Sequence, residues 1–127
     1  MREKYLLDTH ILIWYFQGSD ELSEIAKQSI STGQCFYSLA SLWEIAIKQT
    51  LKKLDFDCDM PYLAEKCSKA GFIQLPVTPQ HIETIKQLPL IHRDPFDRLL
   101  VAQAQCEDLT IITHDRYIKQ YQVKTVF

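Results

Sequence analysis

The chain has 127 residues, of which 46% are hydrophobic and 24% charged, a composition typical of ordinary globular proteins and unlike disordered or fibrous ones. This length suits one domain, residues 1–127, with a substantial buried core. The formal net charge of −2 creates no global basic field, so attraction to a polyanion would have to come from local patches.

The N-terminal segment contains a six-residue apolar run, residues 11–16, which is too short to span a bilayer and lacks the layout of a signal peptide. We therefore expect a cytoplasmic protein with no membrane partner. The four cysteines form no CxxC pair and show no zinc-site spacing, so they are expected to be reduced.

The first half of the chain alternates short apolar runs with helical patterns. Residues 5–7 are typical of a buried strand, and residues 11–16 either continue it or begin a helix after a break at Asp8. Apolar side chains then repeat at helical spacing between Ser19 and Gly33. A strand is expected next at residues 35–38, followed by a helix at residues 39–51.

The second half continues the alternation. Asp59 with Pro61, and Thr78 with Pro79, are typical helix starts. The patterns predict helices at residues 60–70, 79–88, 95–106 and 115–121, and strands at residues 72–76, 109–113 and 123–127. Strands that are apolar throughout and alternate with helices indicate an α/β layered domain with a mainly parallel sheet. In such sheets, functional sites form beyond the carboxyl ends of the strands.

Acidic residues fall at the places where strands give way to helices. Asp8 directly follows the first strand, and Glu44 lies early in the helix after the second. Asp94 and Asp97 begin the apolar helix, and Asp115 comes two residues after the strand 109–113. Because these places lie on one edge of a parallel sheet, we expect the carboxylates to gather there.

Helix capping is an alternative explanation for most of these acids. Asp94 before Pro95 is a standard cap, and Asp97 at the third helical position can reach back to the cap amide. Ser41 and Glu44 in "SLWE" fit a capping box, and Asp115 could cap the helix that follows it. A cap contributes about 1 kcal/mol, which suffices to explain any one of these acids.

Capping does not explain the acids taken together. A carboxylate at the end of a buried strand, as at Asp8, costs several kcal/mol unless it is compensated. Carboxylates gathered at one edge also raise one another's pKa values. A divalent cation would relieve both costs, and hard oxygen ligands suit Mg²⁺ or Mn²⁺, as one or two ions. Such a centre polarises a phosphate and activates water, so phosphodiester hydrolysis fits best.

Four segments in this order and spacing resemble a known family: "LLDTHILIW", "SLWEIAIK", "HRDPFDRLLVAQA" and "TIITHD". The chain resembles PIN-domain proteins, and more narrowly the VapC toxins of type II toxin–antitoxin systems. The resemblance implies a three-layer α/β/α sandwich, RNA cleavage dependent on Mg²⁺ or Mn²⁺, a homodimer, and inhibition by a cognate VapB-like antitoxin.

The resemblance also implies roles for individual residues. It makes Asp8, Glu44, Asp97 and Asp115 the catalytic, metal-binding carboxylates. Asp94 is then the helix cap or a supporting group. Thr9 and Thr113 match small hydroxyl positions that can hydrogen-bond a carboxylate or bound water.

Several other residues lie close to the acids. His10, His92 and His114 could make a mixed His/carboxylate metal site, although a place at the rim is the more ordinary explanation. Among the basic residues, those that flank the proposed site are the better candidates for RNA phosphate contacts: Arg93, Arg98 and Arg116. Arg98 and Arg116 could instead neutralise the acids. Trp14 and Trp43 are expected in the core or at an interface.

Two further functions remain open from the sequence. One is a Mg²⁺-dependent phosphatase or phosphoryl-transfer domain in which Asp8 is the nucleophile, although Lys119 and Lys124 are poorly placed to bind the phosphoryl group. The other is a binding module without catalytic activity, whose acids serve as helix caps alone.

Overall fold

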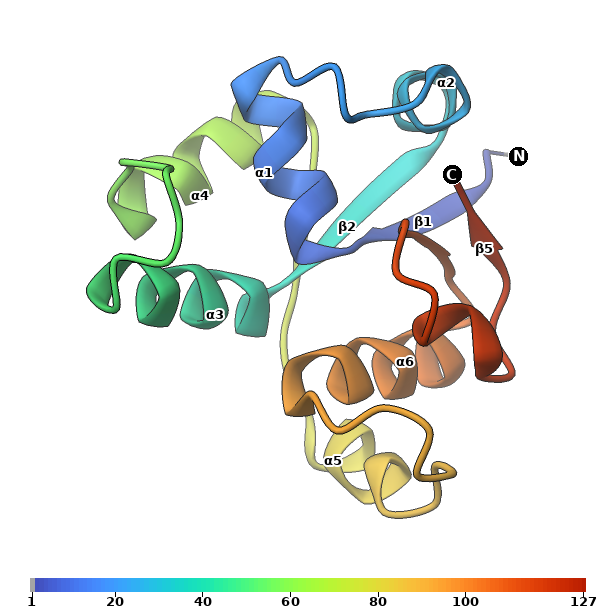
Figure 1. The fold of residues 1–127 in the computed structure, drawn as a ribbon. Helices are drawn as coiled ribbons and strands as arrows, with labels where there is room; N and C mark the ends of the chain where they lie inside the picture. Colours follow the sequence, from blue (N-terminus) through green and yellow to red (C-terminus); the bar gives the residue numbers. More distant parts are fainter. Residues whose placement is uncertain (1) are drawn as a thin grey trace.

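The computed structural model describes residues 2–127 and contains a parallel sheet with helices on both faces (Figure 1). The strands are β1 (Lys4–Leu7), β2 (Gln34–Ser38), β3 (Ile73–Leu75), β4 (Thr110–Ile112) and β5 (Thr125–Val126). The helices are α1 (Thr9–Gln17), α2 (Glu24–Thr32), α3 (Leu39–Thr50), α4 (Met60–Lys69), α5 (Pro79–Ile85) and α6 (Pro95–Glu107), with a 3₁₀ turn η1 (Ile118–Gln120). Within residues 2–127, none of the helices is both long and apolar enough to cross a membrane.

The sheet has the order β3-β2-β1-β4-β5, and all four of its strand pairs are parallel. The chain moves outward from β1 through β2 to β3, and then returns to the other side of β1 to form β4 and β5. The gap between the carboxyl ends of β1 and β4 is therefore the topological switch point, where sites in open α/β sheets form. Leu7 is paired with Ile112, so β1 and β4 end side by side.

Alternate strand residues face two separate cores, as the strand periodicity of two requires. Leu7, Tyr37 and Ile112 pack with α1, α2, α3 and α4 on one face. Leu6 and Ile111 pack on the other face with α6 and the residues after α5. Figure 1 shows these helices on opposite sides of the strands. The expected three-layer α/β/α sandwich with a parallel central sheet is confirmed.

Two expected helices differ from the structure. The helix expected after Ser19 begins only at Glu24, because Ser19 Oγ accepts from Glu21 N–H in a turn and Ser23 becomes the cap. The helix expected at residues 115–121 is reduced to η1, since so short a segment gains too few hydrogen bonds to offset helix nucleation. The apolar run at residues 11–16 lies within α1 and does not continue β1.

Candidate metal centre

Asp8 lies at the switch point, directly after β1, and its residue is 4% exposed. Its backbone N–H donates to Ile112 O (3.1 Å), which holds the end of β1 against β4. Its side chain does not cap α1. Instead, Asp8 Oδ2 accepts a 2.6 Å hydrogen bond from Thr113 Oγ1, the supporting hydroxyl that the resemblance implied. A buried hydroxyl thus fixes the orientation of this carboxylate.

Asp115 follows β4, and its two carboxylate oxygens have different neighbours. Oδ1 accepts hydrogen bonds from the N–H groups of Tyr117 (2.7 Å) and Ile118 (3.0 Å), so the expected capping role is real for this oxygen. Asp115 N–H donates to Thr113 Oγ1 (3.0 Å), which links both acids through one threonine. Oδ2 points elsewhere, 3.7 Å from His92 Nε2. Capping therefore explains the contacts of Oδ1 but not the position of Oδ2.

The two aspartates of "DPFD" contact different groups. Asp94 Oδ1 accepts from Phe96 N–H (2.8 Å) and Asp97 N–H (3.3 Å), which makes Asp94 the cap of α6. The Asp97 carboxylate does not reach back to the cap amide, because that amide donates to His92 Nδ1 (3.4 Å). Asp97 Oδ2 lies 2.8 Å from His92 Nε2. Asp94 is thus the helix cap, and Asp97 is the residue that belongs to the site.

His92 sits between the carboxylates of Asp97 and Asp115. Its Nδ1 accepts the Asp94 N–H, and its Nε2 lies 2.8 Å from Asp97 Oδ2 and 3.7 Å from Asp115 Oδ2 without forming a hydrogen bond. Its backbone N–H donates to Tyr121 Oη (2.8 Å), and its ring lies 4.9 Å from that of Tyr117. Ligand atoms of His92, Asp97 and Asp115 all lie within 4.8 Å of one another.

Glu44 supplies a fourth carboxylate from the second turn of α3 and is 4% exposed. The capping-box interpretation of Ser41 and Glu44 is wrong, because α3 already begins at Leu39 with Ser38 as its cap. Glu44 Oε2 forms an ion pair with Lys48 Nζ at 3.0 Å. Among the residues that the structure describes, nothing hydrogen-bonds the buried Oε1.

The electrostatics of the cluster show that these acids share one space. The pKa of Asp97 is raised to about 8, first by burial and then by the negative charges of Asp8, Asp94, Asp115 and Glu44. The pKa of Asp8 is also raised, chiefly by burial, although its hydrogen bond from Thr113 acts in the opposite direction. Without a cation, such a cluster holds protons at neutral pH.

The donor set fits a hard divalent cation. Asp8, Glu44, Asp97 and Asp115 offer carboxylate oxygens, which are the ligands that Mg²⁺ and Mn²⁺ prefer. The orphaned Glu44 Oε1 and the raised pKa of Asp97 are the costs that a bound cation would remove. His92 Nε2 is buried without a hydrogen-bond partner and lies with oxygens of Asp97 and Asp115 in a group that could hold a metal ion.

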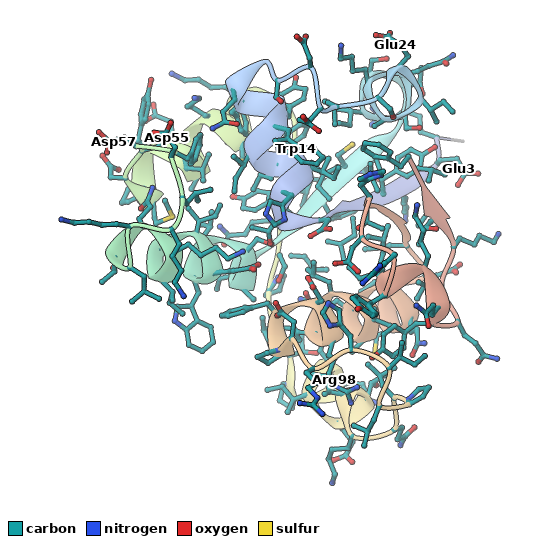
Figure 2. The ribbon with its side chains drawn as sticks, viewed as in Figure 1. Glu3, Trp14, Glu24, Asp55, Asp57 and Arg98 are labelled. Atoms are coloured by element: carbon teal, nitrogen blue, oxygen red, sulfur yellow. The ribbon has the colours of Figure 1, made fainter. Side chains whose placement is uncertain are left out.

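The other expected site residues have varied surroundings. Thr9 Oγ1 donates to Ser41 Oγ (2.9 Å), a buried bond between α1 and α3, and not to a carboxylate. Arg98 donates to the backbone oxygens of Pro89 and Ile85 and to Tyr121 Oη, which braces the segment before α6 (Figure 2). It does not neutralise the acids.

Arg93 and Arg116 are exposed, and Arg116 packs on the Tyr117 ring. In place of the expected arginines, Lys48 and His92 contact the acids. Lys48 could have been found from its position four residues after Glu44 on one helix. His92 lies in the irregular segment before α6, where no periodic pattern indicates the direction of a side chain.

A pocket of about 250 Å³ opens beside the acids. It is lined by Asp8, His10, Trp14, His114 and Asp115. Trp14 is half-buried at this pocket, whereas Trp43 is 64% exposed on α3 and contacts Phe96, so Trp43 is not a core residue.

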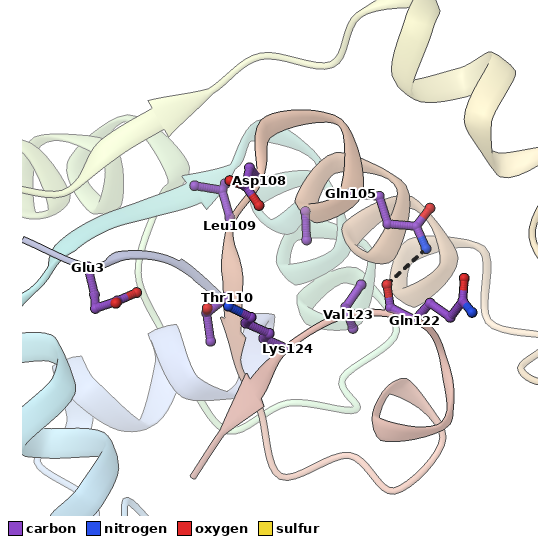
Figure 3. A pocket seen from close by; sticks show the side chains of 9 residues that line it. Glu3, Gln105, Asp108, Leu109, Thr110, Gln122, Val123 and Lys124 are labelled. Carbon is purple, nitrogen blue, oxygen red and sulfur yellow. Dashed lines mark hydrogen bonds between the residues drawn. The ribbon is translucent and has the colours of Figure 1, made fainter.

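A second pocket, of about 480 Å³, lies at the opposite end of the strands, where β1 and β4 begin (Figure 3). Its polar lining includes Glu3, Asp108 and Lys124, and Gln105 Nε2 donates to Gln122 O at 3.3 Å. It is larger, but it contains none of the four clustered acids. The pocket at the carboxyl ends of the strands is therefore the better functional candidate.

The fold and the acid cluster define an α/β domain with a carboxylate site at the carboxyl edge of its parallel sheet. The PIN domain family model matches residues 5–124, and the chain belongs to this family. The resemblance seen in the sequence is thereby confirmed. Comparison with curated proteins gives no match.

Solved structures share this fold at low sequence identity. A toxin–antitoxin complex from Klebsiella pneumoniae superposes with a TM-score of 0.66 and 21% identity, covering 97% of this chain and 96% of that one. VapBC2 from Rickettsia felis, bound to a DNA fragment from its promoter, gives 0.65 and 12%, covering 97% of both chains. FitAB bound to the IR36 DNA fragment gives 0.63 and 16%, covering 96% and 93%.

Proposed function

We propose that the protein is a metal-dependent endoribonuclease of one domain, residues 1–127, which hydrolyses RNA phosphodiester bonds in the cytoplasm. The observation that carries this proposal is the meeting of four carboxylates from four separate segments, one of which has its pKa raised to about 8. A protein keeps so unfavourable a cluster when a cation compensates it.

Asp8, Glu44, Asp97 and Asp115 would hold one or two Mg²⁺ or Mn²⁺ ions. When bound, the cation polarises the phosphodiester and lowers the pKa of the attacking water. Thr113 holds Asp8 in place, and the N–H groups of Tyr117 and Ile118 fix one oxygen of Asp115. A cation held by Asp97 would lower the pKa of this carboxyl group from about 8 and so favour its ionised form.

The rival functions fit these contacts less well. A binding module whose acids are caps is contradicted by Asp8, Glu44 and Asp97, since none of these side chains caps a helix. A phosphoryl-transfer domain with Asp8 as its nucleophile would need a lysine near Asp8 to bind the phosphoryl group. Lys124 instead lines the pocket at the opposite end of the strands.

We further infer that the protein is the toxin of a toxin–antitoxin pair and binds a VapB-like antitoxin. Three structures with the same fold support this proposal, because they are a toxin–antitoxin complex, VapBC2 and FitAB. A homodimer is also part of the proposal. Its support is an apolar groove of about 650 Å³ between α3, α5 and α6, whose lining includes the exposed Leu39, Trp43 and Ile82.

The decisive experiment is incubation of total RNA with the purified protein in Mg²⁺, in Mn²⁺ and in excess chelator. We expect cleavage with either metal, none with chelator, and none with Asp97→Asn. Calorimetric titration of both proteins with Mn²⁺ should give binding to the wild type and a loss of at least tenfold in affinity in the variant. Chelator-resistant cleavage, or an active Asp97→Asn protein, would contradict the mechanism.

A further inference from the structure

We propose that the pocket beside the acid cluster is a nucleobase subsite, which stacks one unpaired base of the RNA next to the phosphate that is cleaved. This inference rests on the proposed nuclease function. The pocket is formed by two segments that follow neighbouring strands: Asp8, His10 and Trp14 after β1, and His114 with Asp115 after β4.

The location ties the pocket to the reaction. Two of its five lining residues, Asp8 and Asp115, are proposed metal ligands. Whatever occupies the pocket therefore lies against the group that would activate the phosphate. In a nucleotide, the base is joined to its phosphate through one sugar, so a base in this pocket positions its own phosphate at the acids.

The other three lining residues carry flat rings. The rings of His10 and Trp14, one helical turn apart on α1, have centroids 6.0 Å apart. The His114 ring lies 4.4 Å from that of Phe127, and Trp14 lies 6.3 Å from the same Phe127. These contacts join the end of the chain to α1 and hold the rings in place. Fixed aromatic rings are the platforms on which single-stranded bases stack.

The charge of the lining residues favours an uncharged base over a phosphate as the occupant of this pocket. Neither lysine nor arginine is among the residues that line this pocket, whereas two carboxylates are. An anionic group would be repelled there, but an uncharged base would not. The pocket volume of about 250 Å³ accommodates one base with part of its sugar and excludes a base pair. Paired bases present no free ring face, so the substrate is a single-stranded region.

Trp14 provides a spectroscopic test of this subsite. In Trp43→Phe it is the remaining tryptophan, and its emission can be followed while adenosine 5′-monophosphate is added in the presence of Mn²⁺. Ribose 5-phosphate is the matched control, because it has the same sugar and phosphate but no base. We expect quenching or a spectral shift of Trp14 with the nucleotide and little change with ribose 5-phosphate. Equal responses to the two compounds, or no response to either, would overturn the proposal.

Substitutions give the second arm of the test, with adenosine 5′-monophosphate in the presence of Mn²⁺ as the probe, because it contains no phosphodiester bond to be cleaved. His114 is exposed, so His114→Ala should fold normally, yet it should weaken binding about fivefold or more. Trp14→Ala should show a similar loss, and Trp14→Phe should restore most of it. If the ring had only a structural role, Trp14→Ala would change the binding of ribose 5-phosphate, which has no base, to the same extent.

Failure of this inference differs from failure of the nuclease proposal. If the wild type binds Mn²⁺ and cleaves RNA while His114→Ala and Trp14→Ala bind adenosine 5′-monophosphate normally, the subsite is wrong and the nuclease stands. If adenosine 5′-monophosphate perturbs Trp14 but no cleavage or Mn²⁺ binding occurs, the subsite stands and the nuclease proposal is wrong.

Discussion

Asp97 is an acid whose ionised form is disfavoured by everything around it. Its side chain is 13% exposed, and negative charges from Asp8, Asp94, Asp115 and Glu44 add to the effect of burial on its pKa. His92 Nε2 lies 2.8 Å from Asp97 Oδ2 but makes no hydrogen bond to it. Because the pKa of Asp97 is raised so far, its titration should contribute to the pH dependence of stability.

Without metal, we expect the stability of the protein to fall between about pH 4 and pH 8. The folded pKa of Asp97, about 8, lies above its ordinary value of 3.8, so the folded state binds more protons than the unfolded state in this interval. The stabilisation is complete below the unfolded pKa and is lost as pH rises through the folded pKa. Urea unfolding at several pH values in chelator measures it.

The variant Asp97→Asn should remove most of this pH dependence and raise the free energy of unfolding at pH 8 by on the order of 3 kcal/mol. The control is Asp57→Asn at an exposed aspartate in the loop after α3 (Figure 2), which should leave the pH profile unchanged. A profile in Asp97→Asn that matches the wild type would show that Asp97 titrates normally in the folded protein.

Thr113 is a second residue with a double role, because it donates to Asp8 and accepts from Asp115 N–H. Thr113→Val keeps the shape but leaves both partners without this hydroxyl. We expect a loss of about 1–3 kcal/mol in stability and weaker Mn²⁺ binding by calorimetry. Thr113→Ser retains the hydroxyl and should keep Mn²⁺ affinity close to that of the wild type. Equal affinities in Val and Ser variants would argue against this positioning role.

Helix α6 brings a cap and a site residue into a single turn. Asp94→Ala should lower stability by about 1 kcal/mol, because the N–H groups of Phe96 and Asp97 lose their acceptor. Asp94→Ser keeps an acceptor and should preserve most of the stability. The effect is opposite in sign to that of Asp97→Asn, three residues away, and urea unfolding of the three variants at pH 8 compares them directly. A stabilising Asp94→Ala would show that repulsion at this position exceeds the benefit of the cap.

At the level of elements, the sequence predicted most helices and strands, because apolar periodicity and caps such as Asp59 and Thr78 operate locally. The gathering of the acids followed from the parallel sheet alone, since Asp8 and Asp115 both follow buried strands. The sequence could not show the place of His92, which depends on Tyr121 and Asp94 across an irregular segment. Nor could it show that Trp14 borders a pocket, because its neighbour there, Phe127, is distant in the chain.

At the scale of the whole molecule, the proposed homodimer leads to a prediction about which surface forms the interface. Trp43 and Ile82, 64% and 56% exposed, line the apolar groove between α3, α5 and α6. Trp43→Glu would place a charge in a buried interface, so it should weaken dimerisation at least tenfold in sedimentation analysis. Ile25→Glu is the matched control on α2, where the residue is 59% exposed but outside the groove. A monomeric wild type, or equal effects of both changes, would place the contact elsewhere.

The hydrogen bond between Thr113 and Asp8 joins residues 105 positions apart, across strands β4 and β1 at the centre of the sheet. A ribosome that makes this chain completes Asp8 long before Thr113 and Asp115 exist. Through most of its synthesis, the emerging polypeptide therefore lacks Asp115 and the threonine that orients Asp8. The proposed ribonuclease site is therefore incomplete on the ribosome, and it cannot cleave the message that is being translated until the final strands have docked.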